Sequence, residues 1–135
     1  MRAAPSLRPG DAAPPRAIGP VTITDIVRFA GAGGDFNPLH HDEAAARAAG
    51  FPSVIAMGQF AAGLVAGVLT DWVGIENVEE LSVRFVAPIS VGELLEVTGL
   101  VEVVDDMGAR IELAVRSGES VKVTAQAQVR QGRPR

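Results

Sequence analysis

The strongest constraint on the fold is the apolar run VIAMGQFAAGLVAGVL, residues 54–69. It predicts a helix from about Gly58 to Trp72 that is apolar nearly all round, and such a helix has to be buried. The run is shorter than a membrane span and contains Gln59, although its glycines would also suit close helix packing in lipid. We therefore expect a core helix of a protein with no membrane-spanning segment, and we expect other elements to wrap that helix completely.

The second half of the chain alternates apolar and polar residues, which is typical of strands with one buried face. Hairpin-type connections follow two of these stretches, at 105–108 and 117–119. A short strand near residues 17–21 is expected to add to the sheet. The predicted strands cover 81–85, 95–103, 110–116 and 121–130. Together with the apolar helix, they predict an α+β fold in which an antiparallel sheet curls around that helix.

Two shorter helices are predicted before the apolar run. Thr24 is the expected N-cap of a helix over 25–30, which the glycines of 31–34 terminate. Asp42 is the expected N-cap of a second helix, which Gly50 and Pro52 stop. Residues 1–16 are broken by prolines and are expected to form a loosely ordered lead-in.

Size and charge exclude several classes of function. The 135 residues suit one domain, 1–135. A net charge of −4 provides no basic field for nucleic acid or an anionic membrane. The absence of cysteine excludes disulfides, thiolate metal sites and cysteine nucleophiles. Because the N-terminus has no continuous apolar region like that of a secretory signal, we expect a cytoplasmic protein.

The stretch GGDFNPLHHDE, residues 33–43, concentrates acid–base groups in a loop. Pro38 has no N–H and keeps Asn37 out of the helical region, so the segment from Asp35 to His40 must bend. A bend of this kind can bring the carboxylate of Asp35 beside the imidazole of His40. Two such groups can polarise one water molecule, which is general base catalysis.

Three other interpretations of this stretch compete. Asp35 could simply accept hydrogen bonds from loop N–H groups. The cluster could hold a metal, but the adjacent His40 and His41 point in different directions and no second ligand cluster appears, so we expect no metal. GAGGD could be mistaken for a phosphate loop, but such a loop follows a strand and precedes a helix, whereas here a helix precedes and a proline turn follows.

The residues GDFNPLHHDEAAARAAGFPSVIAMG resemble the motif of the MaoC-like dehydratases, the (R)-specific enoyl-CoA hydratases with the hotdog fold. The family pattern is approximately G-D-x-N-P-x-H-x-D, a short helix and a segment I-A-H-G-M that opens the central helix. The RPGD lead-in, TDWVG and RFVAPISVGE extend the resemblance over nearly the whole chain. The resemblance implies a hotdog fold with its sheet wrapped around the central helix.

The resemblance also implies a role for individual residues. Asp35 and His40 match the catalytic pair, and the N–H of Gly58 matches the oxyanion contact to the thioester oxygen. Asn37 and Pro38 would brace the loop. Residues expected to line the substrate site are Phe36, Phe51, Ile55, Met57 and Gln59. Met57 stands where the family usually has histidine, and Gln59 where it often has methionine, so both could also be structural.

The implied function is hydration of a trans-2-enoyl thioester, or the reverse dehydration, with CoA or an acyl-carrier protein as the handle. No metal or organic cofactor is implied. The expected assembly is a homodimer, or a heterodimer with another hotdog subunit. Two alternatives stay open: a hotdog acyl-CoA thioesterase and a non-catalytic acyl-thioester-binding subunit.

Overall fold

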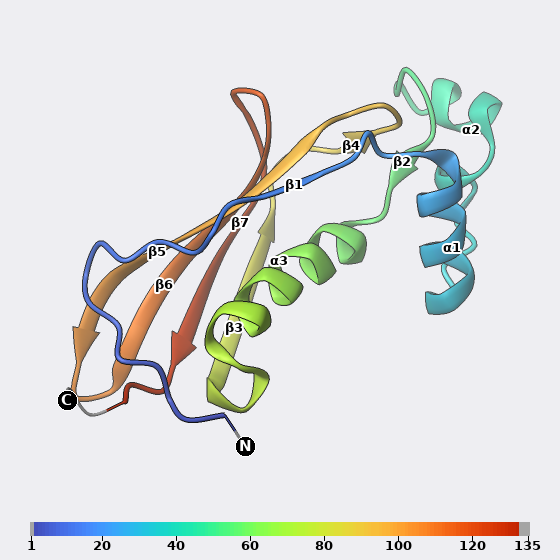
Figure 1. Cartoon of the computed structure of the whole chain (residues 1–135). Helices are drawn as coiled ribbons and strands as arrows, with labels where there is room; N and C mark the ends of the chain where they lie inside the picture. Colours follow the sequence, from blue (N-terminus) through green and yellow to red (C-terminus); the bar gives the residue numbers. More distant parts are fainter. Residues whose placement is uncertain (1, 133–135) are drawn as a thin grey trace.

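The structure is a computed structural model that describes residues 2–132, and one long helix lies along a curved antiparallel sheet (Figure 1). This is the expected α+β hotdog arrangement. The elements in chain order are β1 (Arg16–Ile18), α1 (Ile23–Gly33), the 3₁₀ turn η1 (Pro38–His40), α2 (Glu43–Ala48), β2 (Ile55–Ala56), α3 (Gly58–Val73), the 3₁₀ turn η2 (Ile75–Asn77), β3 (Val78–Phe85), β4 (Ile89–Ser90), β5 (Leu95–Asp105), β6 (Gly108–Ser117) and β7 (Ser120–Val129). No helix within residues 2–132 is long and apolar enough to cross a membrane.

The main sheet has the strand order β1-β5-β6-β7-β3, and every pairing is antiparallel. The four strands predicted from alternation are confirmed as β3, β5, β6 and β7. The strand expected near residues 17–21 lies earlier, at Arg16–Ile18, where it pairs with β5. It ends before Pro20, which has no N–H to donate to a ladder.

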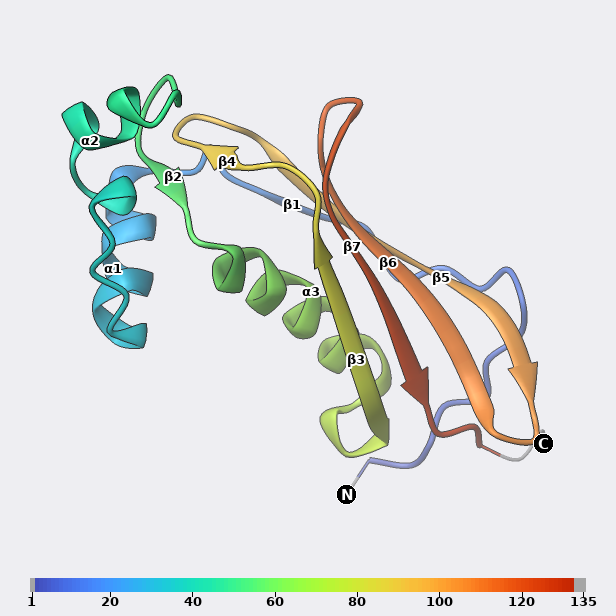
Figure 2. The same ribbon diagram turned by 180° about the vertical axis from the view of Figure 1, so that it is seen from behind.

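A second, two-stranded sheet was not predicted. In it β2 pairs with β4, Ile55 opposite Ser90 and Ala56 opposite Ile89. Each strand has only two residues, which is too short for an alternating pattern to be visible in the sequence. Figure 2 shows this small sheet beside α1 and α2, at the end of the molecule where α3 begins.

The sequence prediction placed the start of α1 two residues late. The N-cap is Thr22 instead of Thr24, and its hydroxyl accepts the Asp25 N–H while the Asp25 carboxylate accepts the Thr22 N–H. This reciprocal capping box satisfies two N–H groups at the start of the helix at once, an advantage that Thr24 does not have. The N-cap predicted for α2, Asp42, is confirmed.

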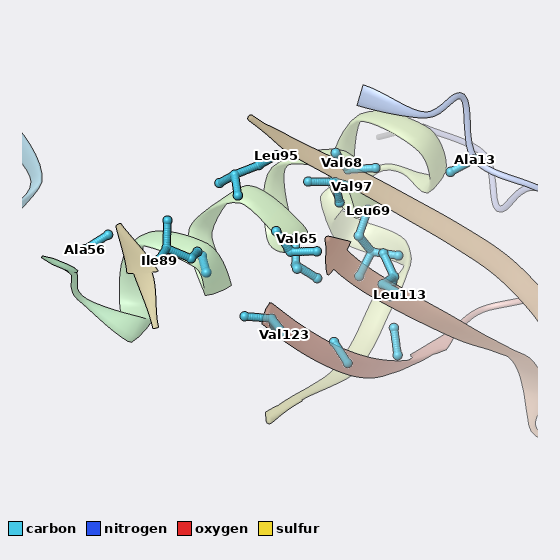
Figure 3. Close-up of a cluster of buried hydrophobic side chains, with 14 of the residues drawn as sticks. Ala13, Ala56, Val65, Val68, Leu69, Ile89, Leu95, Val97, Leu113 and Val123 are labelled. Carbon is cyan, nitrogen blue, oxygen red and sulfur yellow. The ribbon is translucent and has the colours of Figure 1, made fainter. Parts of the chain in front are cut away.

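The helix α3 buries one face against the sheet and forms the centre of the core (Figure 3). The buried residues of α3 are Ala61, Val65, Val68, Leu69 and Val73. The expectation of complete wrapping is wrong, because the opposite face is only partly covered: Gly63 is exposed, and Ala62, Ala66 and Gly67 are half-buried. These residues are small, so they leave little apolar surface in water.

The N-terminal lead-in is packed, unlike the loosely ordered segment that the prolines suggest. The Gly10 N–H donates to the Val101 carbonyl at 2.8 Å, and the Ala13 N–H donates to the Gly99 carbonyl at 2.9 Å. The side chains of Leu7 and Ala13 are buried. The segment therefore lies against β5 instead of projecting away from the sheet.

The core position of α3 generates a stability prediction. Leu69 is fully buried, so Leu69→Ala is expected to lower the free energy of unfolding by about 2–5 kcal/mol through lost burial and a residual cavity. Gly67→Ala on the same helix is the matched control, because a Cβ there meets nothing within 4 Å. It should raise stability by about 0.5–1 kcal/mol. Urea unfolding measures both, and equal effects of the two substitutions would contradict this packing.

Candidate active site

The loop that carries the predicted acid–base pair begins where α1 ends. Gly34 has φ 69° and ψ 23°, a left-handed conformation that glycine adopts without strain. Beyond it the Asp35 N–H donates to the Ala30 carbonyl at 3.0 Å. The glycine cluster thus ends the helix, as predicted, and directs the chain into the loop at Asp35.

Local hydrogen bonds stabilise the bend between Asp35 and His40. The Asp35 Oδ1 atom accepts the Asn37 N–H at 3.3 Å, and the Asn37 Oδ1 atom accepts the Leu39 N–H at 3.1 Å. Pro38 then occupies the first turn of η1, where its missing N–H costs nothing. Oδ1 of Asp35 therefore accepts a hydrogen bond from a loop N–H, as one of the alternative interpretations expected. Oδ2 is available for another partner.

That other oxygen faces His40. The Nε2 atom of His40 lies 3.4 Å from Asp35 Oδ2. The imidazole is nearly enclosed, with 8% of its side chain exposed, whereas 44% of the Asp35 side chain is exposed. The loop thus brings the two predicted residues together, with the histidine inside and the carboxylate at the surface.

The second ring nitrogen of His40 fixes the orientation of the ring. The Nδ1 atom lies 2.7 Å from the carbonyl oxygen of Ile55 in β2. A carbonyl oxygen can only accept, so Nδ1 has to carry the proton of this hydrogen bond. In the neutral imidazole, Nε2 is then the atom with a free lone pair, and it is the atom that faces Asp35.

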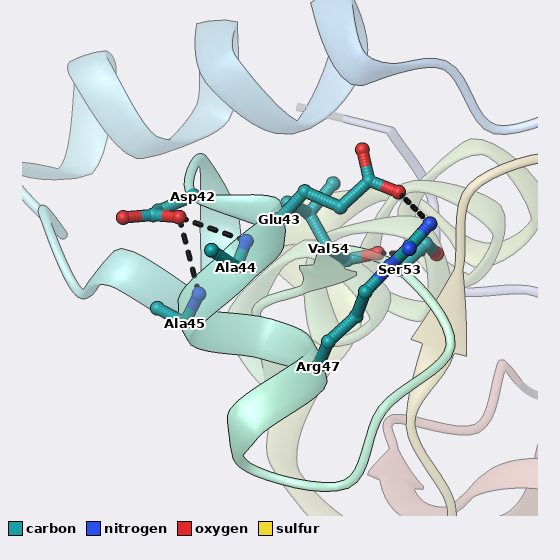
Figure 4. A network of polar contacts seen from close by, with 7 residues as sticks. All are labelled: Asp42, Glu43, Ala44, Ala45, Arg47, Ser53 and Val54. Atoms are coloured by element: carbon teal, nitrogen blue, oxygen red, sulfur yellow. Dashed lines mark hydrogen bonds and ion pairs between the residues drawn. The ribbon is translucent and has the colours of Figure 1, made fainter.

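The remaining polar residues of the stretch have structural partners or face solvent. His41 is exposed. Asp42 accepts the N–H groups of Ala44 and Ala45, and Glu43 forms an ion pair with Arg47 at 2.6 Å (Figure 4). Among the described residues, no group of three or more His, Cys, Asp or Glu side chains is placed to hold a metal ion.

Gly58 is the first residue of α3, where the N–H groups of a helix have no intrahelical acceptor. The preceding Met57 makes no side-chain cap, so the first turn is not closed by its own N-cap residue. The ring of Phe85 lies close above Gly58: a Cβ added there would meet ring carbons at 3.0 Å. Only glycine lets the Phe85 ring pack this close to the start of α3.

An apolar hollow of about 330 Å³ adjoins Gly58. One side of it comes from the β2–α3 segment and the other from the chain between β3 and β4. The residues that line it are Ile55, Ala56, Met57, Gly58, Ala61, Phe85, Val86, Ala87, Pro88, Ile89 and Val123. Apolar side chains dominate this set, so the hollow is suited to an aliphatic group.

The predicted substrate-lining residues divide into two groups. Ile55 and Met57 line the hollow. Phe36 is 71% exposed, Phe51 packs against the core and Gln59 is exposed, and none of these three contributes to its lining. The sequence analysis missed residues 85–89; their signal was the segment FVAPI within RFVAPISVGE, which it matched to the family but to which it assigned no role.

A larger hollow of about 780 Å³ lies over strands β3, β5, β6 and β7. None of the predicted site residues lines it. Its lining mixes polar and apolar residues, and the polar ones include Ser82, Arg84, Thr98 and Thr124. We therefore place the candidate site at Asp35, His40 and Gly58. The loop with the acid–base groups bonds to β2, and β2 leads into the start of α3, which adjoins the apolar hollow.

Two curated relatives are similar to this chain. A 3-hydroxybutyryl-CoA dehydratase from Methylorubrum extorquens is 30% identical over 114 residues, which are 82% of this chain and 73% of the relative. A 3-hydroxyacyl-thioester dehydratase X from Mycobacterium tuberculosis is 40% identical over 77 residues, 56% of this chain. That match spans only 26% of the length of the M. tuberculosis protein.

Solved structures share the fold. The ChsH1–ChsH2 complex from M. tuberculosis contains a chain that is 26% identical and superimposes with a TM-score of 0.81, covering 91% of this chain and 98% of that one. The family model described as the MaoC like domain matches residues 7–124. This match covers most of the chain and includes the loop, β2 and the central helix, and the chain therefore belongs to the MaoC-like domain family.

Proposed function

We propose that this protein is an (R)-specific enoyl-thioester hydratase, which in the reverse direction is a 3-hydroxyacyl-thioester dehydratase. The observation that carries the proposal is the orientation of His40. Its Nδ1 atom is bound to the Ile55 carbonyl, so Nε2 faces the exposed carboxylate of Asp35. An oriented imidazole beside a carboxylate suits proton transfer to and from one water molecule. Relatives named as dehydratases support the same reaction class.

In the hydration direction, Asp35 and His40 hold and deprotonate water, which attacks the β-carbon of a trans-2-enoyl thioester. The proton taken from water passes to the pair, and the pair then delivers a proton to the α-carbon. Both steps use one face of the substrate, so addition is syn. The family resemblance implies the (R)-3-hydroxy product.

The N–H of Gly58 donates to the thioester oxygen in this scheme. Charge develops on that oxygen when the β-carbon is attacked, and N–H groups at a helix N-terminus stabilise such charge. Ile55 lies three positions before Gly58, so a single short segment both orients the imidazole and presents the N–H. The acyl chain then extends into the apolar hollow, where Met57 packs against it.

The proposed partner is a second hotdog subunit, identical or different. Strand β3 is at the edge of the main sheet, and at its end Phe85 and Val86 are about half exposed. Pairing with another subunit would cover such an edge. The structural relative from a two-component complex, ChsH1–ChsH2, supports the heteromeric alternative.

Two other functions remain candidates for the same fold. A thioesterase would use a carboxylate to hydrolyse the thioester and would release free thiol. A non-catalytic subunit would bind the thioester without changing it, an alternative that Met57 at the family's usual histidine position keeps open. Crotonyl-CoA separates the three functions: only the hydratase removes the absorbance of the conjugated double bond without releasing thiol.

The acid–base pair gives the first prediction for activity. His40→Ala and Asp35→Asn should each lower kcat/KM for crotonyl-CoA hydration by at least about 100-fold, the size of a general acid–base contribution. His41→Ala is the matched control, because His41 is exposed and should leave the rate within about twofold. Equal losses in all three variants would contradict the assignment of the pair.

The close packing of Phe85 on Gly58 gives the second prediction for activity. Gly58→Ala places a methyl group against the Phe85 ring and over the first turn, so kcat/KM should fall by about 10-fold or more as the oxygen contact lengthens. Gly63→Ala in the same helix is the control, since its nearest neighbour would be 3.9 Å away. Circular dichroism confirms folding, and a Gly58→Ala protein with wild-type kinetics would exclude this helix terminus as the oxyanion contact.

A further inference from the structure

A β-bulge in the β6–β7 pair falls at one lysine of the main sheet. Across the β6–β7 pair, Val115 lies opposite Val123 and Arg116 lies opposite Val121, so Lys122 has no partner residue on β6. Strict alternation predicts Lys122 on the wetter face of β7, yet only 8% of the residue is exposed. The extra residue of a bulge is left unpaired in its ladder, and here the charged group is buried against the connection between β3 and β5, to which it bonds.

Lys122 holds the chain between β3 and β5 through both its backbone and its side chain. Its carbonyl accepts the Val86 N–H at 2.9 Å and the Ala87 N–H at 3.2 Å. Its Nζ atom donates to the Pro88 carbonyl at 3.0 Å and lies 2.7 Å from Glu93 Oε1. One residue of β7 is therefore tied to four residues of this connection.

Glu93 completes the attachment. Its second oxygen, Oε2, accepts the Ser90 N–H at 2.7 Å, so the carboxylate joins Lys122 to β4. Burial raises the pKa of Glu93, whereas hydrogen bonds from Lys122 and Ser90 lower it. The hydrogen bonds have the larger combined effect, so the pKa lies below its ordinary value. The Glu93 carboxylate is consequently ionised at neutral pH.

The segment held in this way is one wall of the apolar hollow. The wall residues between β3 and β4 are Phe85, Val86, Ala87, Pro88 and Ile89. Three of them, Val86, Ala87 and Pro88, bond directly to Lys122. Ile89 belongs to β4, which pairs with β2 and so joins this wall to the opposite one.

Lys122 is buried and Glu93 is partly buried, and such an ion pair is weak as a source of stability, because desolvation of the charges offsets most of their attraction. What the pair does provide is geometry: hydrogen bonds of fixed direction to Pro88, which is on the wall, and to Ser90, which directly follows it. We propose that Lys122 and Glu93 are positioning residues that fix the 85–89 wall and thereby determine which acyl chains fit beside Gly58. This inference rests on the proposed hydratase function, because it assigns the hollow to the acyl group.

The test compares wild type with the double variant Lys122→Met/Glu93→Gln. The double variant removes both charges and leaves no unpaired ion buried, while the side chains keep similar lengths. The readout is the ratio of kcat/KM for eight-carbon and four-carbon trans-2-enoyl-CoA. Ile111→Ala is the control for destabilisation, because Ile111 is fully buried on β6 and does not line the hollow.

We expect the ratio to change at least about fivefold in the double variant, since a displaced wall either loses contact with the longer chain or stops excluding it. Such a change corresponds to roughly one to two buried methylene groups. In Ile111→Ala the kcat/KM values for the two substrates should change by the same factor, so their ratio should stay constant. An active wild type with a smaller change in the double variant would overturn the positioning role alone, whereas a wild type inert on both substrates would overturn the proposed function and this selectivity with it.

Discussion

The hydrogen bond between His40 Nδ1 and the Ile55 carbonyl is the contact on which the candidate site depends. It joins a loop that follows α1 to the short strand that leads into α3. The strand β2 is in turn held by β4, so the imidazole is oriented by an element of a second sheet. Without this bond Asp35 and His40 would still be close in sequence, but nothing would direct Nε2 to the exposed carboxylate.

The helix α3 combines two roles that are separated along its length. Its middle and end bury Val65, Leu69 and Val73 against the sheet, while its first residue, Gly58, is exposed at the apolar hollow. An N-terminus anchored by such a core has little freedom to move, and preorganised N–H groups stabilise developing charge without reorganising. The same helix therefore accounts for stability through its apolar face and for the proposed chemistry through its terminus.

Much of this could be predicted from the sequence because the signals are local. Alternation identified β3, β5, β6 and β7, and the loop motif predicted that Asp35 and His40 would lie close together, as they do. The small β2–β4 sheet could not be predicted, because two-residue strands carry no period. Alternation along β7 predicts a wetter position for Lys122, but the residue is buried, because the connection between β3 and β5 packs over it and bonds to it. Phe36 and Gln59 adjoin predicted site residues in the sequence, but the structure leaves both exposed outside the hollow. Residues 85–89 reach the hollow from a distant segment, so no local pattern around the loop motif could point to them.

The most direct test of the account is the protonation of the His40 ring. The chain has two histidines, so a tag-free His41→Gln variant leaves His40 as its single imidazole. ¹⁵N NMR of the ring nitrogens in that variant identifies which nitrogen carries hydrogen. The account predicts that the neutral ring carries its hydrogen on Nδ1, which faces the Ile55 carbonyl, and not on Nε2. A neutral ring protonated at Nε2 instead would show that the Ile55 carbonyl does not orient it, and would contradict the proposed role of His40.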